Sequence, residues 1–344
     1  MKVCDFDYNL PKELIAQAPI EGRSGCNMML LNEMGEIEHK KFYDFPNYLK
    51  AGDVLVLNDT KVIPARILGH KKTGAKIEIF LLKPIEGNIW EALIRNSKRL
   101  KEGDIVEVAD VLNIKIVEKT SDTNKVELIY DNSKSIYEIL DIVGKIPLPP
   151  YIEREAEEKD KEIYQTVFAK NLGSVAAPTA GLHFTQEILE ELKNKGVQIA
   201  YITLVVGLGT FLPVKCEEIK DHKMHFETFE ISQETADIIN SAKGKIVACG
   251  TTVVRTLEAT HKKYGKILPI KDDTNIFIYP PYEFKVVDKL LTNFHLPKST
   301  LLMLVSAFSG KENIMKAYEN AVKNKYKFFS YGDCMFLDKI QVAQ

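Results

Sequence analysis

The stretch Ser174-Val175-Ala176-Ala177-Pro178-Thr179-Ala180-Gly181-Leu182-His183-Phe184-Thr185 is the segment around which the rest of the chain is predicted to fold. Small side chains dominate it, so its backbone can approach a bulky group closely. Pro178 restricts Ala177 to an extended conformation, and Gly181 tolerates dihedral angles that other residues resist. We interpret this stretch as a tight loop built to contact something large.

A helix is predicted to begin directly after this loop. Thr185 is a good N-cap, the apolar residues after it have helical spacing, and Gly196 is a typical terminator. The free backbone amides and the dipole at such a helix start favour a ligand with negative charge. The alternative is a connecting loop in which His183 and Phe184 only pack.

The bulk composition is that of an ordinary soluble protein. The chain has 344 residues, which predicts two domains or one large domain with an insertion. Hydrophobic residues make up 45% and charged residues 27%, enough for a sizeable core. Because the formal net charge is only −2, any contact with nucleic acid needs a local basic patch.

The cysteines and the ends of the chain indicate a cellular location. Five cysteines are scattered without CxxC spacing: Cys4, Cys26, Cys216, Cys249 and Cys334. This odd set favours a reducing compartment over a disulfide framework or a zinc knuckle. No signal-peptide pattern opens the chain, and the longest apolar run, residues 301–308, is too short to cross a bilayer. We expect a cytoplasmic protein that does not contact membranes.

Residues 62–151 are predicted to form an inserted domain. Six short β-rich runs, separated by turn residues, follow one another there: 63–68, 75–82, 89–94, 104–108, 114–118 and 125–130. Six strands at this spacing predict a small antiparallel barrel or sandwich. A helical run at 136–143 leads out of it.

The remaining residues, 1–61 and 152–344, are predicted to form one large α/β catalytic domain. A polar run at 153–162 is typical of a solvated linker or lid, and strand-like and helix-like segments then alternate. Strands are expected at 198–206, 245–249 and 275–279. The alternation predicts a large mixed, mostly parallel sheet covered on both faces, with the small antiparallel β-barrel domain inserted in it.

Two nucleotide-binding motifs and a metal site are excluded by their surroundings. Gly207-Leu208-Gly209 is followed by Phe211 and Pro213 where a dinucleotide fingerprint needs a helix. Residues 297–300 resemble the end of a phosphate-binding loop but lack its glycines. His222, His225 and Glu227 are conceivable metal ligands, yet no second cluster completes the shell, so no metal is predicted.

Polar residues gather where the predicted strands end. In open α/β sheets such positions meet at one edge, where ligands bind. Histidines among them offer acid–base groups that titrate near neutrality. For any single residue the alternative is a loop hydrogen bond or a helix cap. The set comprises Asp59, Thr60, His183, Thr210, His222, His225, Glu227, Thr251, Arg255, Asn293, His295, Tyr331 and Asp333.

Basic residues cluster in two turns of the inserted domain. One turn contains Arg95, Lys98, Arg99 and Lys101, and residues 70–72 form the other. Such a cluster is usually a solvated face, but on a β-rich module it also suits RNA phosphates.

Long strings of residues give the chain a resemblance to a known family. They are 58–66, 144–151, 164–167, 174–185, 206–211, 250–258, 292–300 and 329–333. In this order they resemble the S-adenosylmethionine:tRNA ribosyltransferase-isomerase family of queuosine biosynthesis. The chain departs locally from the family pattern at Val206, Phe226, Pro281 and Cys26-Asn27.

The resemblance implies an unusual use of S-adenosylmethionine as a substrate. The family transfers and isomerises its ribosyl unit onto 7-aminomethyl-7-deazaguanine at the tRNA wobble position. Epoxyqueuosine forms, and adenine and methionine are released. The implied mechanism needs a base for the ribose C–H beside the sulfonium and an acid for the departing adenine.

Site residues follow from these needs. We expect His183, His225 and His295 to supply the base and the acid, with Asp59 and Glu227 orienting them or facing positive charge. The residues expected to bind S-adenosylmethionine are Ala177, Pro178, Thr179, Ala180, Gly181, Gly207, Gly209, Thr210, Gly250, Thr251, Thr252 and Arg255. The residues expected to bind tRNA are Arg95, Lys98, Arg99 and Lys101.

Two alternatives remain open at this point. One is an ordinary tRNA methyltransferase, which would release S-adenosylhomocysteine. The other is a catalytically idle RNA-binding protein whose barrel supplies the affinity. For the ribosyltransferase-isomerase, a monomer is expected.

Overall fold

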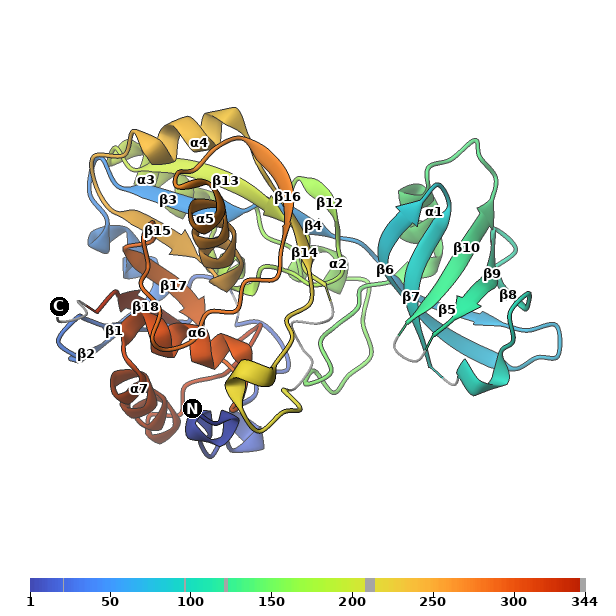
Figure 1. Cartoon of the computed structure of the whole chain (residues 1–344), viewed down its shortest axis with the longest axis horizontal. Coiled ribbons are helices and arrows are strands. Elements are labelled where there is room, and N and C mark those ends of the chain that lie inside the picture. Colours follow the sequence, from blue (N-terminus) through green and yellow to red (C-terminus); the bar gives the residue numbers. More distant parts are fainter. Residues whose placement is uncertain (21, 96, 121–122, 208–213, 341–344) are drawn as a thin grey trace.

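A nine-stranded mixed sheet organises the larger part of the structure, a computed structural model that describes residues 1–20, 22–95, 97–120, 123–207 and 214–340 (Figure 1). The strand order is β16-β14-β13-β3-β15-β17-β18-β1-β2. The strands are β1 (Asn27–Leu31), β2 (Ile37–Lys41), β3 (Val54–Asn58), β13 (Gln198–Leu204), β14 (Glu227–Ile231), β15 (Ile246–Cys249), β16 (Ile270–Thr274), β17 (Lys289–Asn293) and β18 (Cys334–Asp338).

The sheet is mixed, as predicted, but its parallel share is smaller than expected. Among the described strands, four neighbouring pairs are parallel, namely β13–β3, β3–β15, β15–β17 and β18–β1. The other four pairs, β1–β2, β13–β14, β14–β16 and β17–β18, are antiparallel. The five-residue connection between β1 and β2 explains one of these, because a turn that short permits only antiparallel pairing.

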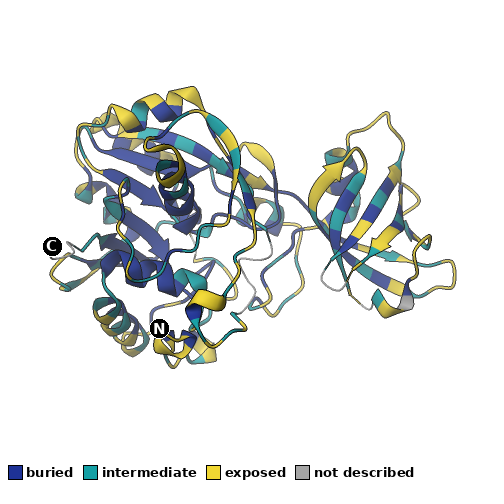
Figure 2. Cartoon of the chain, in the orientation of Figure 1, coloured by how far each residue is buried: buried dark blue, intermediate teal, exposed yellow. Residues whose placement is uncertain are grey.

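Helices cover both faces of this sheet. Along β3 the side chains of Val54 and Val56 enter one core, and those of Leu55 and Leu57 enter the other. The first core is completed by α4 (Gln233–Asn240), α5 (Thr251–Tyr264), α6 (Thr300–Ser309) and α7 (Lys311–Lys323). The second is completed by α3 (Gln186–Asn194) and the 3-10 helix η3 (Phe42–Tyr48). The strands are accordingly buried beneath exposed helix faces (Figure 2).

The inserted β-rich segment closes into an antiparallel barrel. Its described strands pair in the order β11-β5-β6-β7-β10-β9-β8, and an additional β5–β8 pairing closes the ring. The strands are β5 (Arg66–His70), β6 (Lys76–Glu86), β7 (Ile89–Arg95), β8 (Ile105–Val108), β9 (Leu112–Lys119), β10 (Asn124–Tyr130) and β11 (Gly144–Lys145). The helix α1 (Ile136–Val143) begins at Ser135, whose side chain accepts a hydrogen bond from the Glu138 amide. The predicted barrel is confirmed.

The junction between barrel and sheet is a small parallel pair of strands, β4 (Thr60–Val62) and β12 (Asn171–Ser174) (Figure 1). Val175, directly after β12, packs into the hydrophobic core of the barrel. The division at residues 62 and 151 stays a prediction. The other short elements are α2 (Asp160–Ile163) and the 3-10 helices η1 (Val3–Phe6), η2 (Lys12–Leu14), η4 (Ser97–Arg99), η5 (Thr179–His183) and η7 (Ile219–Asp221).

One predicted strand is wrong. The expected strand at 275–279 lies instead at β16, residues 270–274. β16 is at the edge of the sheet and pairs only with β14 in the described structure, so it tolerates the charged residues Lys271, Asp272 and Asp273. Because these residues are charged, the hydrophobicity pattern of the sequence does not indicate a strand there. None of the helices in the described ranges has the length and apolar character needed to cross a membrane.

Candidate active site

The 174–185 stretch forms a buried turn rather than an open loop. η5 occupies Thr179–His183, and the Thr185 side chain accepts a hydrogen bond from the Ile188 amide at the start of α3, as predicted. A Cβ atom on Gly181 would lie 2.8 Å from Phe168 Cζ and 2.9 Å from Thr166 Cγ2. The absence of a side chain at Gly181 therefore serves packing inside the protein.

The start of α5 lies against this turn. Gly250 has φ +90°, and a Cβ atom added to it would be 3.7 Å from Ala180 Cβ. Asn58, at the end of β3, donates to Thr252 Oγ1 at 3.4 Å and to the Leu204 carbonyl at 3.1 Å. Two of the predicted S-adenosylmethionine segments, 177–181 and 250–252, thus meet at the sheet edge.

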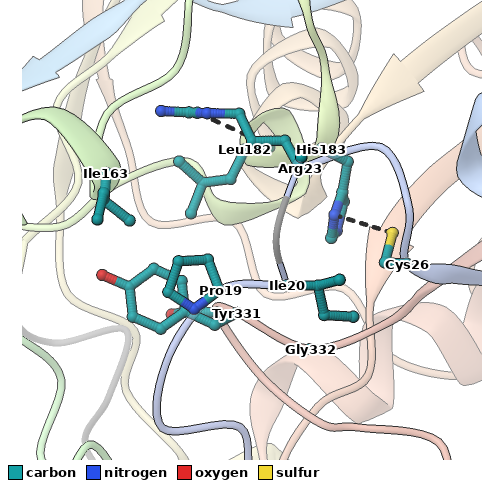
Figure 3. Close-up of a pocket in the computed structure, with 11 residues that line it drawn as sticks. Pro19, Ile20, Arg23, Cys26, Ile163, Leu182, His183, Tyr331 and Gly332 are labelled. Atoms are coloured by element: carbon teal, nitrogen blue, oxygen red, sulfur yellow. Dashed lines mark hydrogen bonds between the residues drawn. The ribbon is translucent and has the colours of Figure 1, made fainter.

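His183 lies at the wall of a cavity of about 250 Å³ (Figure 3). The ring is buried, and Nδ1 lies 3.3 Å from Cys26 Sγ. The apolar part of the wall comes from residues far apart in the sequence. The lining residues are Pro19, Ile20, Gly22, Arg23, Cys26, Ile163, Leu182, His183, Ser330, Tyr331 and Gly332.

Asn293 fixes which nitrogen of His183 carries a proton. The Asn293 Nδ2 donates to the carbonyls of Phe329 (2.8 Å) and Ser330 (3.3 Å). Its Oδ1 therefore faces His183 Nε2 at 3.0 Å, and a carbonyl oxygen only accepts. Nε2 must be the N–H nitrogen, so Nδ1 is the atom that exchanges a proton with Cys26.

Cys26 and Cys334 belong to this site although sequence reasoning missed them. Cys26 precedes β1 and Cys334 begins the neighbouring strand β18, so parallel pairing brings them together. Hydrogen bonding to Cys334, together with the charge and hydrogen bond of His183, lowers the pKa of Cys26 to about 5. No spacing rule signals this pair, because strand register alone makes them neighbours.

Three side chains of this site lie close together. Among groups of three or more His, Cys, Asp or Glu side chains in the described residues, Cys26, His183 and Cys334 have one donor atom each within 4.8 Å of one another. His222, His225 and Glu227, weighed as ligands from the sequence, do not form such a group in that part of the chain. His225 is exposed, and the His222 ring packs on Phe277 with 5.2 Å between ring centroids.

Arg255 and Glu227 form a buried ion pair beside the start of α5. Arg255 Nη1 donates to Glu227 Oε2, and both side chains are less than a tenth exposed. Among the described residues, no hydrogen-bond acceptor meets Nε or Nη2 of Arg255. A buried guanidinium with donors to spare is suited to an incoming anion.

His295 is buried in a different environment. Its Nε2 lies 3.0 Å from Thr292 Oγ1, and its backbone carbonyl accepts from the Tyr8 hydroxyl at 2.5 Å. Burial lowers the pKa of His295 to about 3, so the ring is neutral near pH 7. The residue is not part of the wall of the cavity that contains His183.

Asp59 lines a second pocket of about 560 Å³ that does not include His183. The Thr203 hydroxyl donates to Asp59 Oδ1 at 2.6 Å, and Asn171 Nδ2 lies 3.1 Å from Oδ2. The structure therefore separates Asp59 from the His183 cavity. Gly207 is partly exposed, whereas Gly209 and Thr210 lie outside the described residues.

The basic turn of the barrel is held in place by a lysine side chain from β9. Lys119 Nζ donates to the carbonyls of Ser97 and Leu100, both at 2.7 Å. Lys98 and Lys101 are exposed on this turn, and Arg95 donates to Glu78 at 3.0 Å. The side chain of Arg99 lies outside the described structure.

A mixed α/β sheet with a buried histidine at a cavity near its strand ends defines an α/β enzyme with an inserted barrel. The comparisons with known proteins narrow this class. The family model described as queuosine biosynthesis protein matches residues 3–337. An S-adenosylmethionine:tRNA ribosyltransferase-isomerase from Sulfurihydrogenibium sp. (strain YO3AOP1) is 58% identical over 342 residues, which cover 98% of this chain and 100% of that protein.

A solved structure agrees. The crystal structure of S-adenosylmethionine tRNA ribosyltransferase from Thermotoga maritima has 36% sequence identity and a TM-score of 0.55, covering 97% of this chain and 99% of that chain. The chain belongs to the queuosine biosynthesis protein family, as the sequence strings predicted. It is an enzyme of the transferase–isomerase type that acts in tRNA modification.

Proposed function

We propose that this enzyme transfers and isomerises the ribosyl unit of S-adenosylmethionine onto 7-aminomethyl-7-deazaguanine at the wobble position of tRNA. The products are epoxyqueuosine-tRNA, adenine and methionine. The names of the relatives given above support the assignment of S-adenosylmethionine and tRNA as substrates. The observation that favours this chemistry over pure RNA binding is His183, buried at a cavity wall with one proton fixed by Asn293 and the other shared with Cys26.

The amino-acid end of S-adenosylmethionine is assigned to Arg255 and the first turn of α5. The methionine carboxylate accepts from Nε and Nη2 of Arg255, while Glu227 holds the guanidinium in place through Nη1. Thr251 and Thr252 begin α5, where free amides and the helix dipole favour an anion. The small residues 177–181 are assigned to the nucleoside, and Gly207, Gly209 and Thr210 stay candidates for binding it.

Proton transfer is assigned to histidines near this pocket. The sulfonium makes the neighbouring ribose C–H acidic, so a modest base suffices once water is excluded. His183 and His295 are buried enough to act in a dry site, whereas His225 reaches it only if the pocket closes over it. Asp59 and Glu227 orient their neighbours.

The barrel is assigned to tRNA. The anticodon loop is single-stranded, so its wobble base can be splayed out into the enzyme and stacked there. Lys98 and Lys101 on the exposed turn, with Arg95 and Arg99, contact phosphates. We further propose a cytoplasmic monomer whose barrel domain spans residues 62–151.

Product analysis tests the proposal. Purified enzyme is mixed with S-adenosylmethionine and tRNA that contains the aminomethyl deazaguanine, with unmodified tRNA as control. Free adenine and methionine are expected with the tRNA that contains the aminomethyl deazaguanine and not with the unmodified tRNA. S-adenosylhomocysteine would indicate a methyltransferase, and binding of tRNA without any turnover would indicate an idle RNA-binding protein. His183→Asn is expected to abolish adenine release.

A further inference from the structure

His183 contacts two buried side chains, Asn293 and Cys26, and a third, Cys334, lies close to them. Asn293, at the end of β17, fixes the proton on Nε2, and Cys26 Sγ faces Nδ1 at 3.3 Å. Cys334 completes the cluster from β18, with the three ligand atoms within 4.8 Å of one another. All of these residues are buried, yet Cys26 and His183 also line the cavity.

We propose that Cys26 and His183 form a thiolate–imidazolium pair at the cavity wall, in which His183 is the acid that protonates the departing adenine and Cys26 is the positioning residue that keeps it protonated. This assignment rests on the proposed function, which left the acid and the base unassigned. It gives a role to two cysteines that the family resemblance does not use.

The surroundings favour the charged form of this pair. Burial lowers the pKa of His183, but the charge and hydrogen bond of Cys26, the hydrogen bond to Asn293 and the charge of Asp333 together raise it above its ordinary value. The pKa of Cys26 is lowered by Cys334 and by His183 itself. A thiolate in contact with an imidazolium is the arrangement that activates cysteine in many enzymes.

Other charged groups near the pair are accounted for. Asp333, directly before β18, raises the pKa of His183, while its carboxylate accepts from the amides of Asn27 and Lys327. Arg23 lines the same cavity, and its guanidinium donates to the carbonyls of Gln165, Leu182 and Glu162. Tyr331, across the cavity, is neutral because burial raises its pKa.

The proton balance of the step is simple. The bond between the ribose carbon and adenine breaks, and its electron pair goes to the adenine ring. The imidazolium proton on Nδ1 of His183 moves to the adenine, which leaves as a neutral molecule. Nδ1 is then unprotonated beside the Cys26 thiolate. The group that took the proton from the ribose releases it to solvent, and Nδ1 takes one proton from solvent before the next turnover, so the imidazolium is restored.

Nitrogen NMR of the full chain with labelled histidine tests the pair without any substrate. The His183 signals, identified as those absent from His183→Asn, are expected to show both ring nitrogens protonated at pH 7. In Cys26→Ser, Nδ1 is expected to be unprotonated at the same pH. Cys249→Ser removes a buried thiol outside the cluster and is expected to leave the signals unchanged.

Adenine release tests the acid role. At pH 7.5, Cys26→Ser is expected to release adenine about 100-fold more slowly, the usual contribution of a general acid. Its rate is expected to recover as the pH falls, because a neutral His183 regains its proton. Cys26→Asp restores a negative charge and is expected to recover part of the rate at pH 7.5.

Three results would overturn the inference: a neutral His183 in the unaltered enzyme, a Cys26→Ser variant with the same histidine signals or the same pH profile, or a stoichiometric metal ion bound by the cluster. If the unaltered enzyme released no adenine, the proposed function would fail instead, and the NMR result would be independent of that failure.

Discussion

Arg255 donates to Glu227 through one guanidinium nitrogen only, and both residues are buried between α5 and β14. Removing the carboxylate leaves an uncompensated buried charge. We expect Glu227→Gln to lower the free energy of unfolding by about 3–5 kcal/mol, measured by urea denaturation. Asp272→Asn breaks the exposed pair with Lys263 and is the matched control, with little change expected. Equal losses in both variants would contradict a special role for burial.

Arg255→Lys is expected to weaken binding of S-adenosylmethionine. Lysine keeps the positive charge but loses the planar set of donors that a carboxylate accepts from. The KM for S-adenosylmethionine should rise about 10- to 100-fold, the value of one or two charged hydrogen bonds, with a smaller effect on kcat. Steady-state kinetics at saturating tRNA measure both constants. A change in kcat alone would show that Arg255 acts in the chemical step and not in binding of S-adenosylmethionine.

Gly181→Ala is expected to destabilise the turn that contains His183. The added methyl group would lie 2.8 Å from Phe168 Cζ and 2.9 Å from Thr166 Cγ2, so both side chains must move. The expected cost is about 1–3 kcal/mol in thermal or urea unfolding. Gly207→Ala is the control, because in the part of the chain that the structure describes no atom beyond its chain neighbours lies within 4 Å of the added carbon. If Gly181→Ala left the free energy of unfolding unchanged, the turn would accommodate the methyl group without cost.

Charge reversal on the barrel tests its assignment to tRNA. Lys98→Glu with Lys101→Glu is expected to lower tRNA affinity and to reduce the slope of log K against log salt concentration, because fewer phosphate contacts release counterions. Filter binding at several salt concentrations gives both quantities. Lys83→Glu with Lys134→Glu makes the same charge change elsewhere on the barrel. If the two double variants behaved alike, the effect would be one of net charge.

The buried His295 makes stability depend on pH. Its pKa is lowered to about 3 in the folded protein, so between pH 6.5 and 3 the unfolded chain binds a proton that the folded chain does not. Stability should therefore fall with decreasing pH in that window, by up to about 1.4 kcal/mol for each pH unit. Urea unfolding across this range should show a shallower dependence in His295→Gln than in the exposed-site control His225→Gln. Parallel curves would refute the assignment.

Much of the fold follows from local patterns. The barrel strands are short, alternate in polarity and end at turn residues, so each leaves its own signal. β16 leaves none, because the edge position lets Lys271 and Asp273 face solvent, while Asp272 between them pairs with Lys263. The polar run at 153–162 was predicted to be a solvated linker or lid, but one of its residues is not solvated. Asp160 is fully buried and receives two hydrogen bonds of 2.7 Å from Arg154. A pattern of charges does not tell which of them will pair.

The site was predictable only in part. His183, Arg255 and Gly250 were identifiable because they lie in strings shared with a family, and the structure places Gly250 against Ala180. Cys26 and Cys334 are 308 residues apart in a chain of 344 and meet through the register of β1 and β18. The second pocket beside Asp59 likewise depends on how β13 packs, which no single segment encodes.

Val175 packs into the barrel core eight positions before His183 on the same turn-forming stretch. Residues 176–182, five of them in or next to η5, separate this barrel contact from the histidine. If tRNA binds the barrel as proposed, its docking and the placement of His183 depend on the same short segment of the chain.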